Sequence, residues 1–379
     1  MNLALLTYHR VPNFGANLQA LVTIRQLAAR GHDVTILDYI PLGLESVYAK
    51  RVPEDQRAAH EQFVIKNMRI SERLRNMDDC KSWLIDNDVD AFIVGSDAVM
   101  QLRRDSKTAD LQFPNPFWLP AWAKEVKTAM ISGSSMGCSY LRLKQPLNLV
   151  RIARCLLAYD YISVRDRWTQ NLVRNSTLGL RKPPVTPDPV FSLNQVLKRK
   201  EVQQLPNEGI DKPYILLSCM KGRLSDKWVK KFVEISHAHG CDVYELPMPE
   251  GYADLPVDKQ VQFPLPPIQW YLWLKHAQGF VGQRFHSVIA CLHNAVPFVT
   301  IDSYGNLVKD DRKSKIYDLC ERNSVLKQRI LYQMVNDLPP TQAWSILKSF
   351  DIQNAKKNAE EMAHATGDNL DQLLAAISR

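Results

Sequence analysis

Short apolar runs and amphipathic segments alternate from the start of the chain. Residues 3–8 are mainly apolar, residues 16–30 place four apolar side chains on one face of a helix, and residues 34–39 are apolar again. Gly31 stands where a helix commonly ends. Two strands joined by a helix form a βαβ unit, whose parallel sheet binds ligands at the carboxyl ends of its strands. The pattern therefore predicts a ligand-facing loop over residues 9–15.

The same alternation continues and predicts a second sheet. Further strands are expected at residues 91–94, 128–132 and 161–164, and then at 214–218, 243–246, 279–281 and 298–301. Residues 49–83 are predicted to be irregular and mainly helical, and residues 341–379 helical. Between the two series, four prolines in residues 182–189 exclude helix and central strand and indicate an approaching hinge.

The length of the chain favours two domains, because 379 residues exceed what one ordinary hydrophobic core supports. We predict an α/β protein with two Rossmann-like, doubly wound domains facing a cleft. Residues 1–197 would form the first domain and residues 198–379 the second. The C-terminal helix is expected to be able to cross back and brace the first domain.

Charge and composition narrow the range of possible functions. The net charge of +8 is spread over many short basic groups, which fits an anionic substrate or the anionic inner leaflet of a membrane. Nucleic acid is disfavoured because the chain has no zinc-finger spacing and no RNP motif. Seven scattered cysteines without a C-x-x-C pair indicate reduced structural thiols. The first apolar run breaks at His9, too early for a signal peptide, so we expect a cytoplasmic protein, with the inner membrane face as a further option.

The strongest candidate for chemistry is the segment of residues 280–287, where an apolar strand passes through a polar turn into a helix. Arg284 and His286 would then lie at a helix N-terminus, where free N–H groups and a partial positive charge favour anions. An arginine adds a bidentate donor, and a histidine exchanges protons near neutral pH. The alternative is that Arg284 forms a surface ion pair and His286 merely caps the helix.

Other polar residues follow predicted strands or open predicted helices. Arg165 follows residues 161–164, and it could clamp an anion from the first domain or pair with a neighbouring carboxylate. Ser96 and Asp97 end another strand, and they could hold sugar hydroxyls or form a plain helix cap.

The first predicted helix begins in a segment with several candidate ligand-binding residues. Asn13, Gly15, Asn17 and Gln19 could bind an acceptor or simply cap the helix, and the segment lacks the G-x-G-x-x-G pattern of a dinucleotide loop. Five other histidines lie in predicted helices without carboxylates at metal-ligand spacing, so no catalytic metal is expected: His237, His239, His276, His293 and His364.

Together, six segments resemble the polysaccharide pyruvyl transferase family, in the family's order and over most of the chain. They are Asn13-Phe14-Gly15-Ala16-Asn17-Leu18-Gln19-Ala20, Ile93-Val94-Gly95-Ser96-Asp97, Ser163-Val164-Arg165-Asp166, Asp188-Pro189-Val190-Phe191, Arg284-Phe285-His286 and Val296-Pro297-Phe298.

The resemblance implies a GT-B-like pair of domains that moves a pyruvyl group from phosphoenolpyruvate to a sugar of a polysaccharide or lipid-linked saccharide, forming a ketal. No cofactor is implied beyond phosphoenolpyruvate as co-substrate. The first domain would hold the acceptor and the second the donor. Arg284 and Arg165 would bind the donor's phosphate and carboxylate, and His286 would act as general acid.

The sequence departs from the family pattern at two places, which puts the choice of acceptor in question. Ala98-Val99-Met100 stands where many members have Gln-Val-Trp, and Ser287 stands where they have glycine. Two other functions therefore stay open: a GT-B glycosyltransferase that uses a nucleotide sugar, and a non-catalytic glycan- or phosphate-binding relative.

Overall fold

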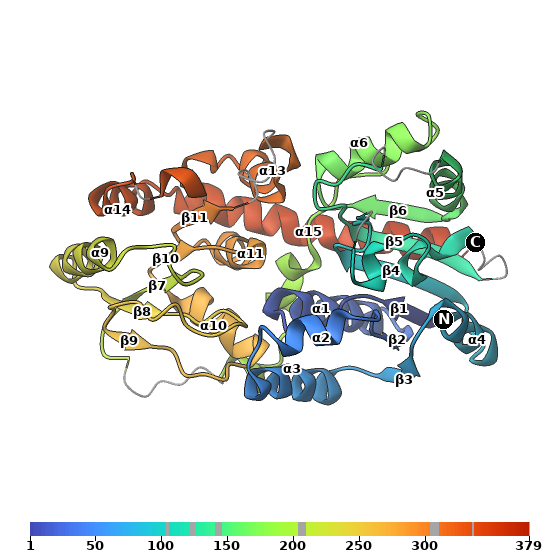
Figure 1. Cartoon of the computed structure of the whole chain (residues 1–379), viewed down its shortest axis with the longest axis horizontal. Helices are drawn as coiled ribbons and strands as arrows, with labels where there is room; N and C mark the ends of the chain where they lie inside the picture. The colour runs from blue at the N-terminus through green and yellow to red at the C-terminus, as the bar shows by residue number, and fades with distance from the viewer. Residues whose placement is uncertain are drawn as a thin grey trace.

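The protein contains two parallel sheets, each covered by helices on both faces (Figure 1). The structure is a computed structural model that describes residues 1–103, 106–121, 126–140, 146–203, 210–303, 311–335 and 337–378. Among the helices of these residues, none is both long enough and apolar enough to cross a membrane.

The first sheet has six parallel strands in the order β3-β2-β1-β4-β5-β6. The strands are β1 (Asn2–Leu6), β2 (Asp33–Tyr39), β3 (Ile70–Leu74), β4 (Ala91–Asp97), β5 (Lys127–Gly133) and β6 (Tyr161–Val164). The helices of this half are α1 (Phe14–Ala29), α2 (Leu44–Ala49), α3 (Glu54–Asn67), α4 (Met77–Asp86), α5 (Pro146–Ala158) and α6 (Arg167–Ser176).

The second sheet repeats this order, since its strands run β9-β8-β7-β10-β11-β12. They are β7 (Tyr214–Ser218), β8 (Asp242–Glu245), β9 (Lys259–Gln260), β10 (Gly279–Gly282), β11 (Phe298–Asp302) and β12 (Arg329–Leu331). The helices after the first sheet are α7 (Leu193–Val196), α8 (Arg199–Val202), α9 (Asp226–Ala238), α10 (Pro267–His276), α11 (Phe285–His293), α13 (Lys315–Arg322), α14 (Pro340–Lys348) and α15 (Ile352–Ile377). The predicted pair of doubly wound, Rossmann-like units is confirmed.

The sequence pattern missed three strands, and all three lie at sheet edges. β3 falls in residues 49–83, which we expected to be mainly helical, and β9 and β12 are the two edges of the second sheet. None of the three is buried along its length. An edge strand packs few neighbours, so its sequence needs no continuous apolar run and gives little signal.

The hydrophobic core lies in three layers, and the middle layer belongs to both halves. One cluster covers the α4–α6 face of the first sheet and another the α9 and α14 face of the second. Between them, one continuous cluster joins α1 to α10, α11 and α15. Phe14 of α1 stacks on Trp270 of α10 with ring centroids 5.1 Å apart. This shared core fixes the carboxyl edges of the two sheets toward each other.

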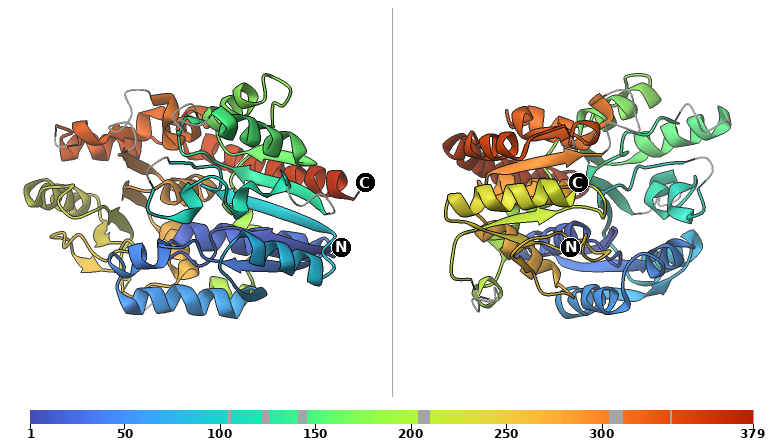
Figure 2. Two further views of the ribbon diagram at one scale, coloured as in Figure 1. Left: turned by 45° about the vertical axis from the view of Figure 1, so that its right-hand side comes forward. Right: turned by 60° about the vertical axis from the view of Figure 1, so that its left-hand side comes forward.

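The C-terminal helix α15 runs beside both halves of the molecule (Figure 2). It packs on β5 and β6 of the first sheet and on α11 of the second half. The Tyr161 hydroxyl donates to Asn369 Oδ1 at 2.7 Å, and Arg30 Nε lies 2.6 Å from Asp371 Oδ1. The boundary at residue 197 stays a prediction.

Substitution Leu370→Ala tests whether α15 stabilises the whole molecule. Leu370 is fully buried in the shared core, and removing such a leucine from a packed core costs about 2–5 kcal/mol. Urea unfolding should therefore show a loss of that size in the free energy of unfolding. Lys357→Ala, on the exposed side of the same helix, serves as the control. Equal effects of the two substitutions would contradict the role of α15 as shared core.

Candidate active site

The two halves face each other at the equivalent point of their sheets, where the strand order reverses. In each sheet the strand order reverses between the first and fourth strands, β1 and β4 in one and β7 and β10 in the other. Ligands of doubly wound sheets bind in the crevice outside this reversal. Asn13 follows β1, Asp97 ends β4, Ser218 ends β7 and Arg284 follows β10, and all four line one pocket of about 80 Å³.

Gly15 brings the first helix against the second half. Asn13 caps α1, and its Oδ1 accepts from the Ala16 backbone N–H at 3.2 Å. A Cβ atom on Gly15 would lie 1.9 Å from Cγ of His286. Only a residue without a side chain therefore leaves room for the imidazole at this point.

The N-terminus of α11 supplies the positive side of the pocket. Phe285, His286 and Ser287 form its first turn, whose backbone N–H groups have no partner within the helix and so favour an anion. Arg284 precedes them with φ of 82°, a conformation that is strained for a residue with a side chain. Lys315, the first residue of α13, lines the same pocket.

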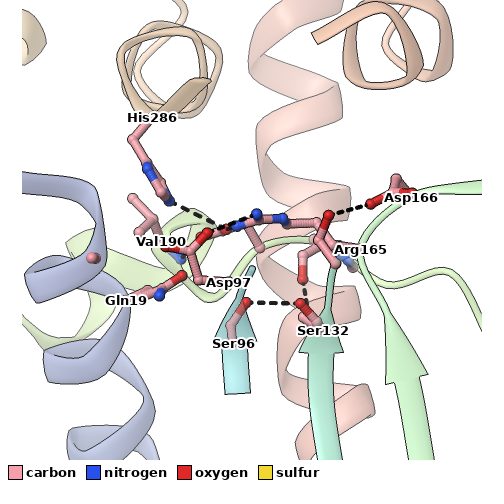
Figure 3. A network of polar contacts seen from close by, with 12 residues as sticks. Gln19, Ser96, Asp97, Ser132, Arg165, Asp166, Val190 and His286 are labelled. Carbon is pink, nitrogen blue, oxygen red and sulfur yellow. Dashed lines mark hydrogen bonds and ion pairs between the residues drawn. The ribbon is translucent and has the colours of Figure 1, made fainter. Parts of the chain in front are cut away.

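A buried carboxylate connects the imidazole to the first half. Asp188 Oδ2 lies 2.6 Å from Arg165 Nη1 and 3.5 Å from His286 Nε2. Arg165 Nη2 lies 3.0 Å from Asp97 Oδ1, and the guanidinium packs 4.6 Å from the Phe285 ring centroid. Figure 3 shows His286 pointing from α11 toward Arg165, with Asp97 beside the guanidinium.

The charges of this network keep both carboxylates ionised. Burial raises the pKa of the Asp188 carboxyl, but the neighbouring His286 and Arg165 outweigh burial and hold that pKa well below its usual value. Burial likewise raises the pKa of Asp97, yet Arg165, Lys315 and His286 together lower it. The ionised Asp188 carboxylate therefore faces the imidazole of His286, with Oδ2 3.5 Å from Nε2.

Six of the residues predicted from the sequence meet in the pocket. Those that line it are Asn13, Gly15, Asp97, Arg284, His286 and Ser287. Arg284 also pairs with Glu250, so the surface ion pair considered from the sequence exists beside the pocket. Arg284 therefore both lines the pocket and forms a surface ion pair.

Four predicted residues lie beneath the pocket instead of in its wall. Asn17 is buried and donates to the His9 carbonyl at 2.6 Å, and Ser96 Oγ donates to the Ser132 carbonyl at 2.9 Å. Gln19 is fully buried within α1. Arg165 is 1% exposed with both terminal nitrogens held by carboxylates, so its placement differs from the expected donor clamp.

Sequence reasoning missed two residues that the structure brings to the site. Lys315 stands in a basic group that we considered only as net charge, and Asp188 only as part of a motif. Asp188 stands between Pro187 and Pro189 in the segment with four prolines, and an ionisable residue in such a rigid segment was the available signal. No local sequence pattern identifies Lys315 as a site residue, because only the fold brings it to the pocket that Arg284 lines.

One group of residues has the composition of a metal site, but it lies elsewhere. Among the described residues, His237, Asp242 and Asp258 have potential ligand atoms within 4.8 Å of one another. None of the three lines the pocket between the sheets. His237 Nε2 instead lies 2.9 Å from Asp258 Oδ2 at the surface.

Solved structures share the fold over the full length of the chain. A UDP-GlcNAc 2-epimerase from Methanocaldococcus jannaschii matches with a TM-score of 0.56 and 10% identity, covering 96% of this chain and 100% of that one. The enzyme from Neisseria meningitidis, bound to UDP-GlcNAc, gives 0.55 and 10% over 100% and 99%. A spinosyn forosaminyltransferase gives 0.52 and 12% over 100% of both chains. At these identities the likeness establishes the two-domain GT-B fold alone.

Family membership rests on a match to a family model over most of the chain. A comparison with curated protein sequences gave no match. The model of the family described as polysaccharide pyruvyl transferase matches residues 13–304, from the N-cap of α1 to just beyond β11. That range contains every predicted site residue and most of the chain. The protein therefore belongs to the polysaccharide pyruvyl transferase family.

Proposed function

We propose that the protein transfers the pyruvyl group of phosphoenolpyruvate to a saccharide or lipid-linked saccharide and forms a pyruvate ketal. The observation that carries the proposal is the convergence of Arg284, Lys315 and the N-terminus of α11 on His286 in one small pocket. Phosphoenolpyruvate has two anionic groups and one carbon that must be protonated. This set of residues matches all three needs.

The size of the pocket favours a small donor over a nucleotide sugar. Pockets for larger ligands commonly measure about 300–1,000 Å³. The pocket between the sheets measures about 80 Å³ and is bounded by buried side chains such as Trp270 and Met248. A compact anion with a phosphate and a carboxylate suits it better than a nucleoside diphosphate with its sugar.

Each residue of the site receives a role from its position. Arg284, Lys315 and the first N–H groups of α11 bind the donor's phosphate and carboxylate. Arg165 acts as a positioning residue, because its guanidinium beneath the pocket holds both Asp97 and Asp188. Asn13 and Ser287 are placed to contact the donor or the acceptor hydroxyl.

The reaction proceeds by protonation and addition. The His286 imidazolium gives its proton to the methylene carbon of the donor, and a sugar hydroxyl forms a C–O bond to C2. The hydroxyl's proton passes toward Asp97, which faces the pocket as a carboxylate. The bond from C2 to the phosphate oxygen then breaks, phosphate leaves, and a second hydroxyl adds to C2 and gives its proton to the departing phosphate. The products are the ketal and inorganic phosphate, and the proton taken up by Asp97 returns to His286 to complete the cycle.

The proposal extends to the setting of the reaction. Phosphoenolpyruvate is the only co-substrate, and no metal or organic cofactor takes part. The chain would work in the cytoplasm, with exopolysaccharide precursors as the acceptor class. A lipid-linked acceptor would place the reaction at the inner face of the membrane, which the basic character of the chain suits.

The function can be tested by following phosphate release from phosphoenolpyruvate with a panel of saccharide acceptors. The wild-type protein should release phosphate only when a suitable acceptor is present. His286→Ala should lower kcat by about 10²–10⁴-fold while donor binding persists, since it removes the proton donor and leaves the cations. Consumption of a nucleotide sugar in place of phosphoenolpyruvate would refute the proposal, and near-normal turnover by His286→Ala would remove that residue from the mechanism.

Asp188→Asn tests whether the carboxylate stabilises the imidazolium. The neutral amide keeps the shape of the side chain but stabilises a cation less, so the fall of kcat on the basic side of the pH profile should move to lower pH. We also expect kcat at neutral pH to fall by about tenfold or more. The KM for phosphoenolpyruvate should change little. An unshifted pH profile would assign Asp188 a purely structural role.

Gly15→Ala tests the close approach of α1 to the imidazole. Alanine is a better helix former than glycine by about 1 kcal/mol, so the helix itself tolerates the change. The new methyl group nevertheless overlaps His286, and we expect kcat to fall by about 10²-fold as the ring is displaced. Gly367→Ala in α15 is the matched control, because its Cβ would meet only Arg30 Nη2, at 3.6 Å. Full activity of Gly15→Ala would contradict the contact.

A further inference from the structure

Exposed apolar side chains gather on the outward side of α5 and on the turn that follows α6. Leu147, Val150 and Leu157 of α5 are 76%, 52% and 43% exposed, and Leu178 and Leu180 of the turn are 91% and 77% exposed. These are five of the twelve large apolar residues exposed among the described residues. Single exposed leucines are ordinary, but a local concentration of this kind marks an interaction surface.

The spacing along α5 shows that the exposed leucines form one face. Leu147, Val150 and Leu157 follow one another at three and seven residues, which keeps them on one side of a helix. The opposite side, with Ile152 and Leu156, is buried in the core of the first half. The outward face of α5 is therefore apolar where a helix on a water-exposed surface is usually polar.

The turn after α6 lies against the end of α5, so the two segments make one surface. Arg181 Nη1 donates to the Leu156 carbonyl at 2.8 Å and to the Leu157 carbonyl at 3.2 Å. Figure 1 shows α5 and α6 together at the outer side of β6. We call this region, made by the outward residues of α5 and by residues 178–182, the α5–α6 surface.

The charged residues of the α5–α6 surface are almost all basic. Arg151 and Arg154 share the outward side of α5 with the apolar residues, and Arg174 and Lys182 are exposed nearby. Residues 147–182 contain two acidic residues, Asp160 and Asp166. Asp166 is buried as the N-cap of α6, and Asp160 pairs with Lys127. Apolar side chains flanked by cations suit an interface between hydrocarbon and anionic headgroups.

We propose that the α5–α6 surface docks the protein on an anionic phospholipid bilayer. The leucines enter the interfacial region, and Arg151, Arg154 and Lys182 meet the phosphates of the headgroups. A symmetric contact with a second copy fits less well, because a two-fold interface would place the same arginines against each other. The proposal deepens the proposed function and rests on it for the lipid-linked acceptor.

A groove beside this surface ends next to the donor pocket. The groove has a volume of about 870 Å³ and lies between Leu149, Leu172 and Leu178 on one side and Tyr317 and Glu321 of α13 on the other. The first turn of α13 separates the groove from the donor pocket, since Lys315 lines the pocket and Tyr317 the groove. Docking would therefore bring a membrane-anchored saccharide to the edge of the site.

Sedimentation of the full chain with lipid vesicles tests the docking. Vesicles of phosphatidylglycerol and phosphatidylcholine should bind the protein, and vesicles of phosphatidylcholine alone should bind it at least tenfold less. Binding to the anionic vesicles should weaken as salt rises, because the cations of the surface are screened. Absence of binding to anionic vesicles at low salt would overturn the proposal.

Two double variants and a control locate the contact. Leu178→Ser with Leu180→Ser should reduce the partition coefficient about tenfold or more, and Arg151→Gln with Arg154→Gln should also flatten its salt dependence. Ile65→Ser with Ile85→Ser is the control, because these residues are 60% and 61% exposed elsewhere in the first half. An equal loss in the control would overturn the assignment of the surface. So would a wild-type dimer in solution that the leucine variant alone dissociates.

The same variants separate docking from catalysis. With a water-soluble acceptor and no vesicles, the leucine and arginine variants should release phosphate from phosphoenolpyruvate as fast as the wild type. Vesicle binding without phosphate release by the wild type would remove the proposed function and leave the docking surface. Phosphate release without vesicle binding would support the proposed function and overturn the docking surface.

Discussion

The arrangement of the site depends on one buried carboxylate. Asp188 is 2% exposed and lies in the proline segment between the two sheets, where it meets Arg165 from the first half and His286 from the second. A buried ion without partners would be strongly destabilising, so each member of this group requires the others. The packing of the two halves and the placement of the imidazole therefore depend on the same buried carboxylate, and a change at Asp188 affects both.

The two sheets contribute complementary groups from equivalent positions. Gly95-Ser96-Asp97 ends the fourth strand of the first sheet, and Gly282-Gln283-Arg284 lies at the end of the corresponding strand of the second. Asp97 and Arg284 both have positive φ, at 85° and 82°. Backbone strain of this kind persists only where the surroundings enforce it. The fold thus presents a carboxylate from one half and a cation from the other across a single pocket.

The sequence predicted the central strands well and the edges poorly. Every inner strand of both sheets carries a buried apolar run, whereas β3, β9 and β12 lack one because they pack few neighbours. At the site, residues next to a strand end or helix start, such as Asp97 and His286, were predictable from local pattern. The pairing of Arg165 with two carboxylates was not, since its partners Asp97 and Asp188 come from distant segments. Lys315 was missed for the same reason.

The fold that this chain shares with epimerases and glycosyltransferases provides the crevice, and the residues of this chain shape it. In all doubly wound sheets the crevice at the strand-order reversal suits an anion, because helix N-termini point into it. In this chain Phe14 of α1 stacks directly on Trp270, and Gly15 lets His286 pack against the same helix. These four residues bound the pocket of about 80 Å³ beside the imidazole. One glycine and one stacked ring pair therefore set the space at the crevice of this chain without any change of fold.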